Sequence, residues 1–212
     1  MKAHLYIRYP YILYSLYCLV YTLRTGAALH CNYLANNIKS CKFTNAYLGT
    51  DYSEDIIKKV AISSGLTPEY QKDIAGTASD IITKNNFLLW FQSRMELGPR
   101  ALGNRSILAP ANSLKIKDEL NLKIKQRSWF QPFCPSILEE DAEKIFEDVT
   151  QYDRFMVMGY NVKEEAVEES KAVAGIDRTA RPQMLGNENK LFRELLKSIK
   201  KEKGIGMLLN TS

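Results

Sequence analysis

The stretch RMELGPRALGNRSILA fills residues 94–109 and interrupts the hydrophobic periodicity of the chain around it. Gly98 and Gly103 lack a Cβ, so the backbone can turn tightly at both positions. The turn carries three arginines, which are Arg94, Arg100 and Arg105. Because guanidinium groups match phosphate and carboxylate oxygens in bidentate geometry, this composition predicts an anion-binding turn. The alternative is a turn whose arginines pair with surface acids.

The same stretch does not fit a phosphate-binding P-loop. Asn104 follows the second glycine, and Arg105 stands where the P-loop motif requires lysine. We therefore expect arginine side chains, rather than a P-loop lysine, to make any phosphate contacts.

A second basic stretch, KIKQRSWFQPFCPS, covers residues 123–136. Lys125 and Arg127 are two residues apart, which in an extended chain places both side chains on one face. The aromatic residues after them predict a stiff apolar support for the two cations, as a polyphosphate site needs. The alternative is a helix end whose basic residues complement the helix dipole, followed by an aromatic core cluster.

Two short polar stretches follow expected strands. DRTARPQ at residues 177–183 carries Arg178 and Arg181, and LLNTS at residues 208–212 runs from a buried strand into amide and hydroxyl side chains. Each is an ordinary loop pattern when taken alone.

The remaining sequence predicts a mixed α/β domain, because helices and strands intermix without strict alternation. Ser53 and Gly65 bound a helix by their capping preferences. Helices are expected at residues 26–37, 53–64, 68–84, 113–126, 140–147 and 187–203. Strands are expected at residues 86–92, 134–138, 155–160, 171–176 and 206–210, with an acidic loop at 163–170. The strand at 86–92 is expected to be buried.

Composition narrows the class of protein further. The chain has 212 residues, a net charge of +5, 45% hydrophobic residues and 25% charged residues, which is ordinary for a globular protein. Its four cysteines and two histidines show no metal-ligand spacing, so no metal site and a reducing, cytoplasmic setting are expected. The uncharged segment 9–23 is either the apolar core of a signal peptide or, as we favour, a buried or degenerate segment.

The four motifs, in this order, resemble the C-terminal domain of NodU-type ATP-dependent O-carbamoyltransferases from about residue 43 onward. The resemblance implies a YrdC-like α/β fold with a mixed twisted sheet and flanking helices. It also implies that the domain binds ATP with Mg²⁺ and carbamoyl phosphate and makes carbamoyl-adenylate. GAALHC at residues 26–31 is similar to the last helix of the preceding domain, which has an actin-like ATPase fold. That domain would hold Fe or another metal and pass the carbamoyl group to a substrate hydroxyl.

The expected division is therefore residues 1–40 as the end of the preceding domain and residues 41–212 as the C-terminal domain. We expect the chain to be truncated at both ends, with residues 1–24 unmatched. ATP, carbamoyl phosphate and the preceding domain are the expected partners, and neither nucleic acid nor a membrane is expected. The open alternatives are a non-catalytic module that binds nucleotide or RNA, and an inactive fragment.

The resemblance also implies roles for individual residues. Those expected to be catalytic are Lys125, Arg127 and Arg100. Those expected to bind ATP or the carbamoyl group are Arg105, Arg181, Ser106, Asn210, Thr211 and Ser212. Three positions depart from the family pattern: Ser93 and Arg178 replace glycines, and Gln131 replaces a frequent arginine. Arg178 would be strained if the glycine it replaces has a positive φ.

Overall fold

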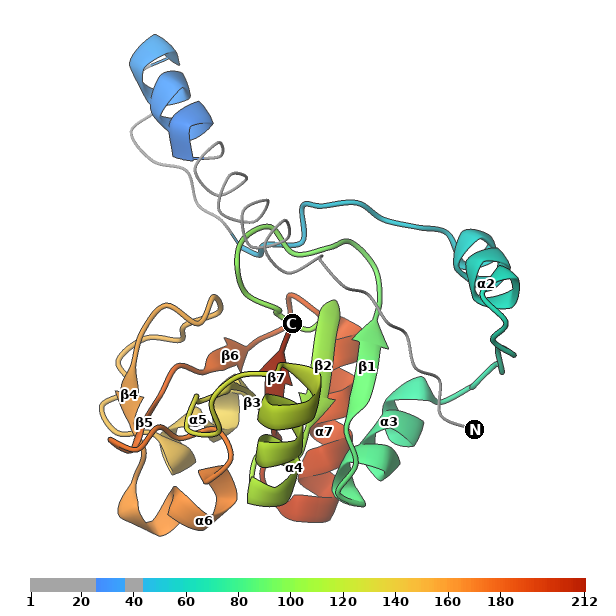
Figure 1. Ribbon diagram of the computed structural model, residues 1–212. Helices are drawn as coiled ribbons and strands as arrows, with labels where there is room; N and C mark the ends of the chain where they lie inside the picture. Colours follow the sequence, from blue (N-terminus) through green and yellow to red (C-terminus); the bar gives the residue numbers. More distant parts are fainter. Residues whose placement is uncertain (1–25, 37–43) are drawn as a thin grey trace.

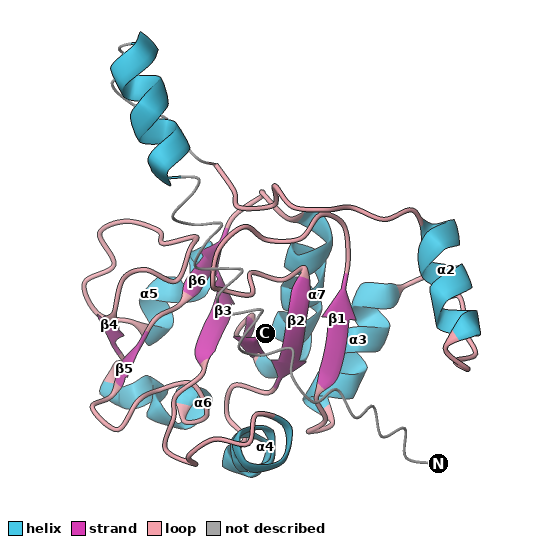
Figure 2. Ribbon diagram, turned by 45° about the horizontal axis from the view of Figure 1, so that its top comes forward, coloured by secondary structure: helices cyan, strands magenta, loops and turns pink. Residues whose placement is uncertain are grey.

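The computed structural model describes residues 26–36 and 44–212 and shows a mixed α/β fold. Its main sheet has the strand order β1-β2-β7-β3-β6, and only the β3–β6 pair is parallel. A short ribbon, β4-β5, lies beside it (Figures 1 and 2). The strands are β1 (Leu88–Phe91), β2 (Arg105–Ala109), β3 (Cys134–Leu138), β4 (Tyr160–Asn161), β5 (Thr179–Ala180), β6 (Gln183–Leu185) and β7 (Met207–Thr211). The expected mixed sheet with flanking helices is confirmed.

Helices cover both faces of the sheet (Figure 1). The longer ones are α2 (Glu54–Ser63), α3 (Ile74–Thr83), α4 (Leu114–Glu119) and α7 (Lys190–Lys203). Shorter helical turns are η1 (Leu120–Ile124, a π-turn), η2 (Glu139–Asp141), α5 (Ala142–Ile145), η3 (Glu164–Ala166) and α6 (Val167–Ser170). Residues 26–36 form a further helix, as expected, and it projects from the sheet and its flanking helices.

Two apolar cores form on the two faces of the sheet. The first contains side chains of α3 and α7, and the second contains side chains of α4, η1, α5 and the segments around α6. Strand β7 contributes to both, because Leu208 and Leu209 alternate between the faces and are fully buried. The expected strand at 206–210 and the inward face of helix 187–203 are confirmed by this packing.

Several expected elements are wrong in extent or kind. Helix α3 begins later than residue 68, because the Asp73 side chain accepts the Gly76 N–H and caps the helix there. Segment 155–160 is a loop apart from its last residue, segment 163–170 is helical rather than an open loop, and segment 171–176 is a turn. Strand β1 lies at the edge of the sheet, where Leu89 is 77% exposed, so the expected burial holds only for Trp90.

Other expectations concern the chain ends and metal binding. The segment 9–23 lies outside the described residues. Within residues 26–36 and 44–212, no helix is long and apolar enough to cross a membrane. Over the same residues, no group of three or more His, Cys, Asp or Glu side chains is placed to hold a metal ion.

Candidate anion-binding site

The arginine-rich turn is held by a buried carboxylate. Oε1 of Glu96 accepts the backbone N–H of Leu102 at 2.8 Å, of Asn104 at 2.7 Å and of Arg105 at 3.1 Å. A concave turn of backbone N–H groups is a typical anion site, and here an anion of the protein already occupies it. The backbone of the turn is therefore used for structure, and the side chains that it presents are left to meet a ligand.

Glycine is required at both ends of this turn. Gly98 has a φ of 114° and Gly103 a φ of 99°, and both values favour a residue without a Cβ. A Cβ on Gly103 would also lie 2.3 Å from Cδ1 of Phe192 on α7. The turn thus packs directly against the helix behind the sheet.

Neighbouring side chains fix the carbonyl groups of the same turn. The Trp90 indole donates to the Gly103 carbonyl at 2.9 Å, and the Tyr47 hydroxyl donates to the Leu102 carbonyl at 2.9 Å. Burial raises the pKa of Tyr47 to about 12, so this hydroxyl remains a donor at neutral pH. Ser106, which is buried, accepts the Gly103 N–H at 3.1 Å. Ser106, expected as a ligand-binding residue, therefore supports the turn from behind.

Arg105 does not reach the same place as Arg100. Its guanidinium stacks 3.6 Å from the centre of the Phe91 ring and donates to the carbonyls of Gln92 at 2.6 Å and Ser93 at 2.9 Å. It joins β2 to the segment after β1 and does not line the cavities described below. The ligand contact expected for Arg105 has no support in this geometry.

Three arginines from distant parts of the chain do meet. Arg100, Arg127 and Arg181 line one cavity of about 220 Å³ beside the end of β7. No Asp or Glu is among its lining residues in the described part of the chain. The other lining residues are Pro99, Ala101, Gln131, Pro132, Phe133, Cys134, Met156, Asn210, Thr211 and Ser212. Cations with no acid among them favour an anionic ligand.

A larger and mainly apolar cavity adjoins the first. It has a volume of about 660 Å³ and shares Pro99, Arg100, Met156 and Arg181 with the arginine cavity. Its further walls include Leu48, Leu97, Leu102, Phe155 and Val157. The two together offer a charged end and an apolar end to one ligand.

Arg127 is positioned by an irregular helix end. After α4 the chain widens into the π-turn η1, and the Lys125 N–H bonds to the Leu120 carbonyl at 2.8 Å. Arg127 then donates from Nε to Oδ1 of buried Asn121 at 2.7 Å and lies 4.5 Å from the centre of the Phe133 ring. Side-chain donation and ring stacking hold the guanidinium at the cavity wall.

The expected extended Lys-x-Arg pair is wrong in conformation. Lys125 has helical backbone angles, and Gln126 between the two cations has a φ of 50°. Burial and then the charge of nearby Arg127 lower the pKa of Lys125 to about 8. Lys125 is not among the residues that line either cavity. The expected aromatic support is Phe133 alone, because Trp129 and Phe130 are exposed.

One loop forms a wall of both cavities, and the carboxylate of Asp153 shapes it. The Asp153 carboxylate accepts the backbone N–H groups of Phe155 at 2.8 Å, Val157 at 2.6 Å and Met158 at 2.6 Å. Because the carboxylate consumes these donors, the segment curls into a loop instead of pairing as the expected strand.

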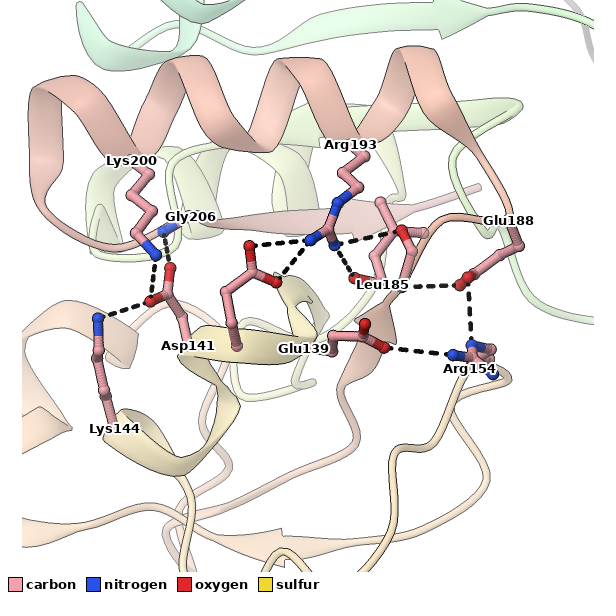
Figure 3. A network of polar contacts seen from close by, with 11 residues as sticks. Glu139, Asp141, Lys144, Arg154, Leu185, Glu188, Arg193, Lys200 and Gly206 are labelled. Atoms are coloured by element: carbon pink, nitrogen blue, oxygen red, sulfur yellow. Dashed lines mark hydrogen bonds and ion pairs between the residues drawn. The ribbon is translucent and has the colours of Figure 1, made fainter.

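The next residue, Arg154, fastens this loop to the rest of the domain. It lies 3.2 Å from carboxylate oxygens of both Glu139 and Glu188 (Figure 3). The same view shows Asp141 binding Lys144 and Lys200, which ties the segment after β3 to α7. The wall of the cavity is thus connected to the helix behind the sheet.

The three residues that depart from the family pattern lie at positions with a positive φ or in the arginine cavity. Ser93 has a φ of 44° and Arg178 a φ of 59°, so both residues that replace glycines lie in the left-handed region, and the condition for strain at Arg178 is met. Gln131 lines the arginine cavity, where a longer cation would add to the three already present.

Sequence reasoning missed Glu96, Asn121 and Asp153. Each is a polar side chain inside an irregular segment, and each is buried while satisfying backbone or arginine groups. The only signal in the sequence was their place within segments that lack regular periodicity.

Comparison with known proteins matches these features to one family. Residues 79–212 match the family described as carbamoyltransferase C-terminus. The chain belongs to this family. The family match contains the arginine turn, the Lys125–Arg127 stretch and β7.

Curated relatives extend the similarity beyond the carbamoyltransferase C-terminus match. An uncharacterized protein of Methanocaldococcus jannaschii is 40% identical over 172 residues, which are 78% of this chain and 28% of the relative. Nodulation protein NolNO of Sinorhizobium fredii is 37% identical over 88% of this chain and 28% of its own length. Nodulation protein NolO of Bradyrhizobium diazoefficiens is 35% identical over 81% of this chain and 32% of its own length. The chain therefore spans about a third or less of these relatives.

Proposed function

We propose that this chain is the nucleotide-handling part of an ATP-dependent O-carbamoyltransferase, in which ATP and carbamoyl phosphate yield carbamoyl-adenylate. The observation that carries the proposal is the convergence of Arg100, Arg127 and Arg181 on one cavity without an acid in its lining. Membership of the carbamoyltransferase family supports the choice of a carbamoyl group.

The reaction needs positioning and charge stabilisation more than a protein nucleophile. Carbamoyl phosphate first loses its phosphoryl group to water, which leaves carbamate and inorganic phosphate. A carbamate oxygen then attacks the α-phosphorus of ATP, and pyrophosphate leaves with the bond electrons. Negative charge grows on the phosphoryl oxygens, where three guanidinium groups stabilise it. Lys125, beside Arg127, adds a fourth positive charge below a pH of about 8.

The adjoining cavity supports the nucleotide. Its lining is mainly apolar, and its volume of about 660 Å³ lies in the range of roughly 300–1,000 Å³ typical of small-molecule sites. A nucleobase in this apolar part would leave the phosphates at the shared arginines, Arg100 and Arg181. Mg²⁺ would arrive on the phosphates, since no Asp or Glu side chain is among the described residues that line the arginine cavity.

Transfer to a substrate hydroxyl would use a preceding domain. The relatives named above are at least three times as long as their matched parts, which leaves room for such a domain. Helix α2 supports this partner, because it has no buried residue and exposes Ile56, Ile57 and Val60 on one face. Apolar side chains in a row on one helix are typical of a contact surface.

The test is pyrophosphate release by the purified chain with ATP and Mg²⁺, measured with and without carbamoyl phosphate. We expect release only when carbamoyl phosphate is present. Arg181→Gln should lower the rate by at least about tenfold, because it removes a charged contact to phosphate. Lys125→Ala should lower the rate less, because Lys125 lies beside Arg127 but outside the lining of both cavities. Arg178→Gln is the matched control, since Arg178 is an exposed arginine outside both cavities. Absence of release from a folded chain that binds ATP would contradict the proposal.

A further inference from the structure

Three neighbouring strands carry a row of buried polar side chains next to the arginine cavity. Ser136 on β3, Gln183 on β6 and Asn210 on β7 are each at most 2% exposed. They are hydrogen-bonded to one another and to two backbone carbonyls of the arginine-rich turn. A polar row inside an apolar sheet needs a reason, because burial of polar groups is unfavourable unless they are paired.

The carbonyl groups at its two ends fix the direction of every bond in this row. The Leu102 carbonyl only accepts, so Nε2 of Gln183 must donate to it, at 2.9 Å. Oε1 of Gln183 then accepts the hydroxyl proton of Ser136 at 2.7 Å. With its proton committed, the Ser136 oxygen accepts from Nδ2 of Asn210 at 2.9 Å. The same Nδ2 donates its second hydrogen to the Ala101 carbonyl at 3.1 Å.

One acceptor in this hydrogen-bond network has no partner among the described residues. Rotating the Asn210 amide by half a turn would place its oxygen against the Ala101 carbonyl, so the amide can point only one way. Oδ1 of Asn210 is buried and has no hydrogen-bond partner among the residues that the structure describes. Asn210 also lines the arginine cavity, between Ala101 of the turn and the β7 end at Thr211. An oriented, unpaired acceptor beside a cation-lined cavity fits a ligand that brings its own N–H group.

We propose that Oδ1 of Asn210 accepts a hydrogen bond from the amide nitrogen of the bound carbamoyl group, and that this bond selects carbamoyl over acyl phosphates. The inference rests on the proposed function and names the substrate feature that its site reads. A carbamoyl group and an acetyl group have the same trigonal shape, but the NH₂ of the first is a methyl in the second. A methyl would leave Oδ1 unpaired, whereas the arginines would hold either phosphate.

The experiment is calorimetric titration of the purified chain with carbamoyl phosphate, acetyl phosphate and inorganic phosphate. We expect carbamoyl phosphate to bind about tenfold more tightly than acetyl phosphate, the fold-change of one good hydrogen bond to an otherwise unpaired group. Inorganic phosphate measures the arginine contribution alone.

Two variants remove the acceptor in different ways. Asn210→Ala deletes it, and Asn210→Val deletes it while keeping a side chain that suits a buried strand, in case the alanine variant does not fold. Both variants should bind carbamoyl phosphate and acetyl phosphate with nearly equal affinity. Ser79→Ala is the matched control, because Ser79 Oγ is also buried without a partner among the described residues but lies on α3, outside both cavities. It should keep the wild-type ratio.

The outcomes separate this inference from the function on which it rests. Equal affinity of the wild-type chain for carbamoyl and acetyl phosphate would overturn the role of Asn210 and leave the proposed function standing. A tenfold preference that persists in a folded Asn210 variant would overturn it as well. Failure of the folded wild-type chain to bind any of the three phosphates would contradict the proposed function, and the inference with it.

Discussion

At the scale of single residues, Glu96 explains how an arginine-rich turn can be rigid without a ligand. Its carboxylate accepts backbone N–H groups that would otherwise attract phosphate, and it places Arg100 at the cavity. The proposed phosphate-binding turn therefore offers arginine side chains to the ligand, because its backbone donors are already bonded to Glu96. That distinguishes it physically from a P-loop, where the backbone itself cradles the anion.

Replacement of Glu96 tests this account. Glu96→Ala leaves the buried N–H groups of Leu102, Asn104 and Arg105 without their acceptor, so the free energy of unfolding should fall by about 3 kcal/mol or more. Urea denaturation followed by circular dichroism measures the change. Glu143→Ala, at an exposed glutamate on α5, should change it by less than about 0.5 kcal/mol. Equal stabilities of the two variants would show that the turn does not depend on Glu96.

The lowered pKa of Lys125 predicts a pH dependence of ligand binding. The folded-state pKa is about 8, so the ammonium is present below that pH and is lost above it. The affinity for carbamoyl phosphate should therefore fall between about pH 7 and about pH 9, as the positive charge beside Arg127 is lost. Lys125→Arg keeps the charge and should give a flat profile. A wild-type profile as flat as that of the arginine variant would show that the charge of Lys125 does not affect the bound ligand.

The two residues with glycine-like backbone angles predict gains in stability. Ser93→Gly and Arg178→Gly should each raise the free energy of unfolding by about 1 kcal/mol, because side chains at positive φ are strained. The ion pair of Arg178 with Glu164 is exposed and contributes little. Arg178→Ala is the control, since it removes the ion pair and keeps the strain. If Arg178→Ala stabilises the fold as much as Arg178→Gly, the gain comes from loss of the arginine side chain and not from relief of backbone strain.

At the scale of elements, sequence periodicity predicted the regular parts and failed in the irregular ones. Strand β7 and helix α7 were predicted because their apolar residues follow the strand and helix periods through the core. Segments 155–160 and 171–176 are apolar as well, but Asp153 curls the first into a loop and Ala172 and Val173 reach the core from a turn. Strand β2 was not predicted, because the glycines just before it interrupt the hydrophobic pattern of a strand.

The contact between the arginine turn and α7 predicts a sharp difference between two glycines. Gly103→Ala would place a Cβ 2.3 Å from Phe192 at a φ of 99°, and should destabilise the fold by about 3 kcal/mol. Gly159→Ala, where no atom lies within 4 Å of the added Cβ, should cost less than about 1 kcal/mol. Thermal unfolding of both variants decides the point. Similar melting temperatures would mean that the turn does not pack on α7 as described.

At the scale of the whole molecule, the fold brings together residues that the sequence keeps far apart. Motif resemblance gave Arg100, Arg127 and Arg181 as candidates, but only the sheet order places the turn, the π-turn end and the segment before β6 around one cavity. The same order separates Arg105 and Ser106 from that cavity, although they belong to the same motif as Arg100. The motifs predicted which residue types form the site. Tertiary packing determines which of those residues line the cavity.

We propose that the cavity lined by Arg100, Arg127 and Arg181 holds the phosphates of the substrates. The most direct measurement is a crystal structure of the chain soaked with carbamoyl phosphate and a non-hydrolysable ATP analogue. We expect phosphate density within hydrogen-bond distance of Arg100, Arg127 and Arg181, with the nucleobase in the adjoining apolar cavity. Well-ordered ligand density elsewhere on the chain, with this cavity empty, would contradict it.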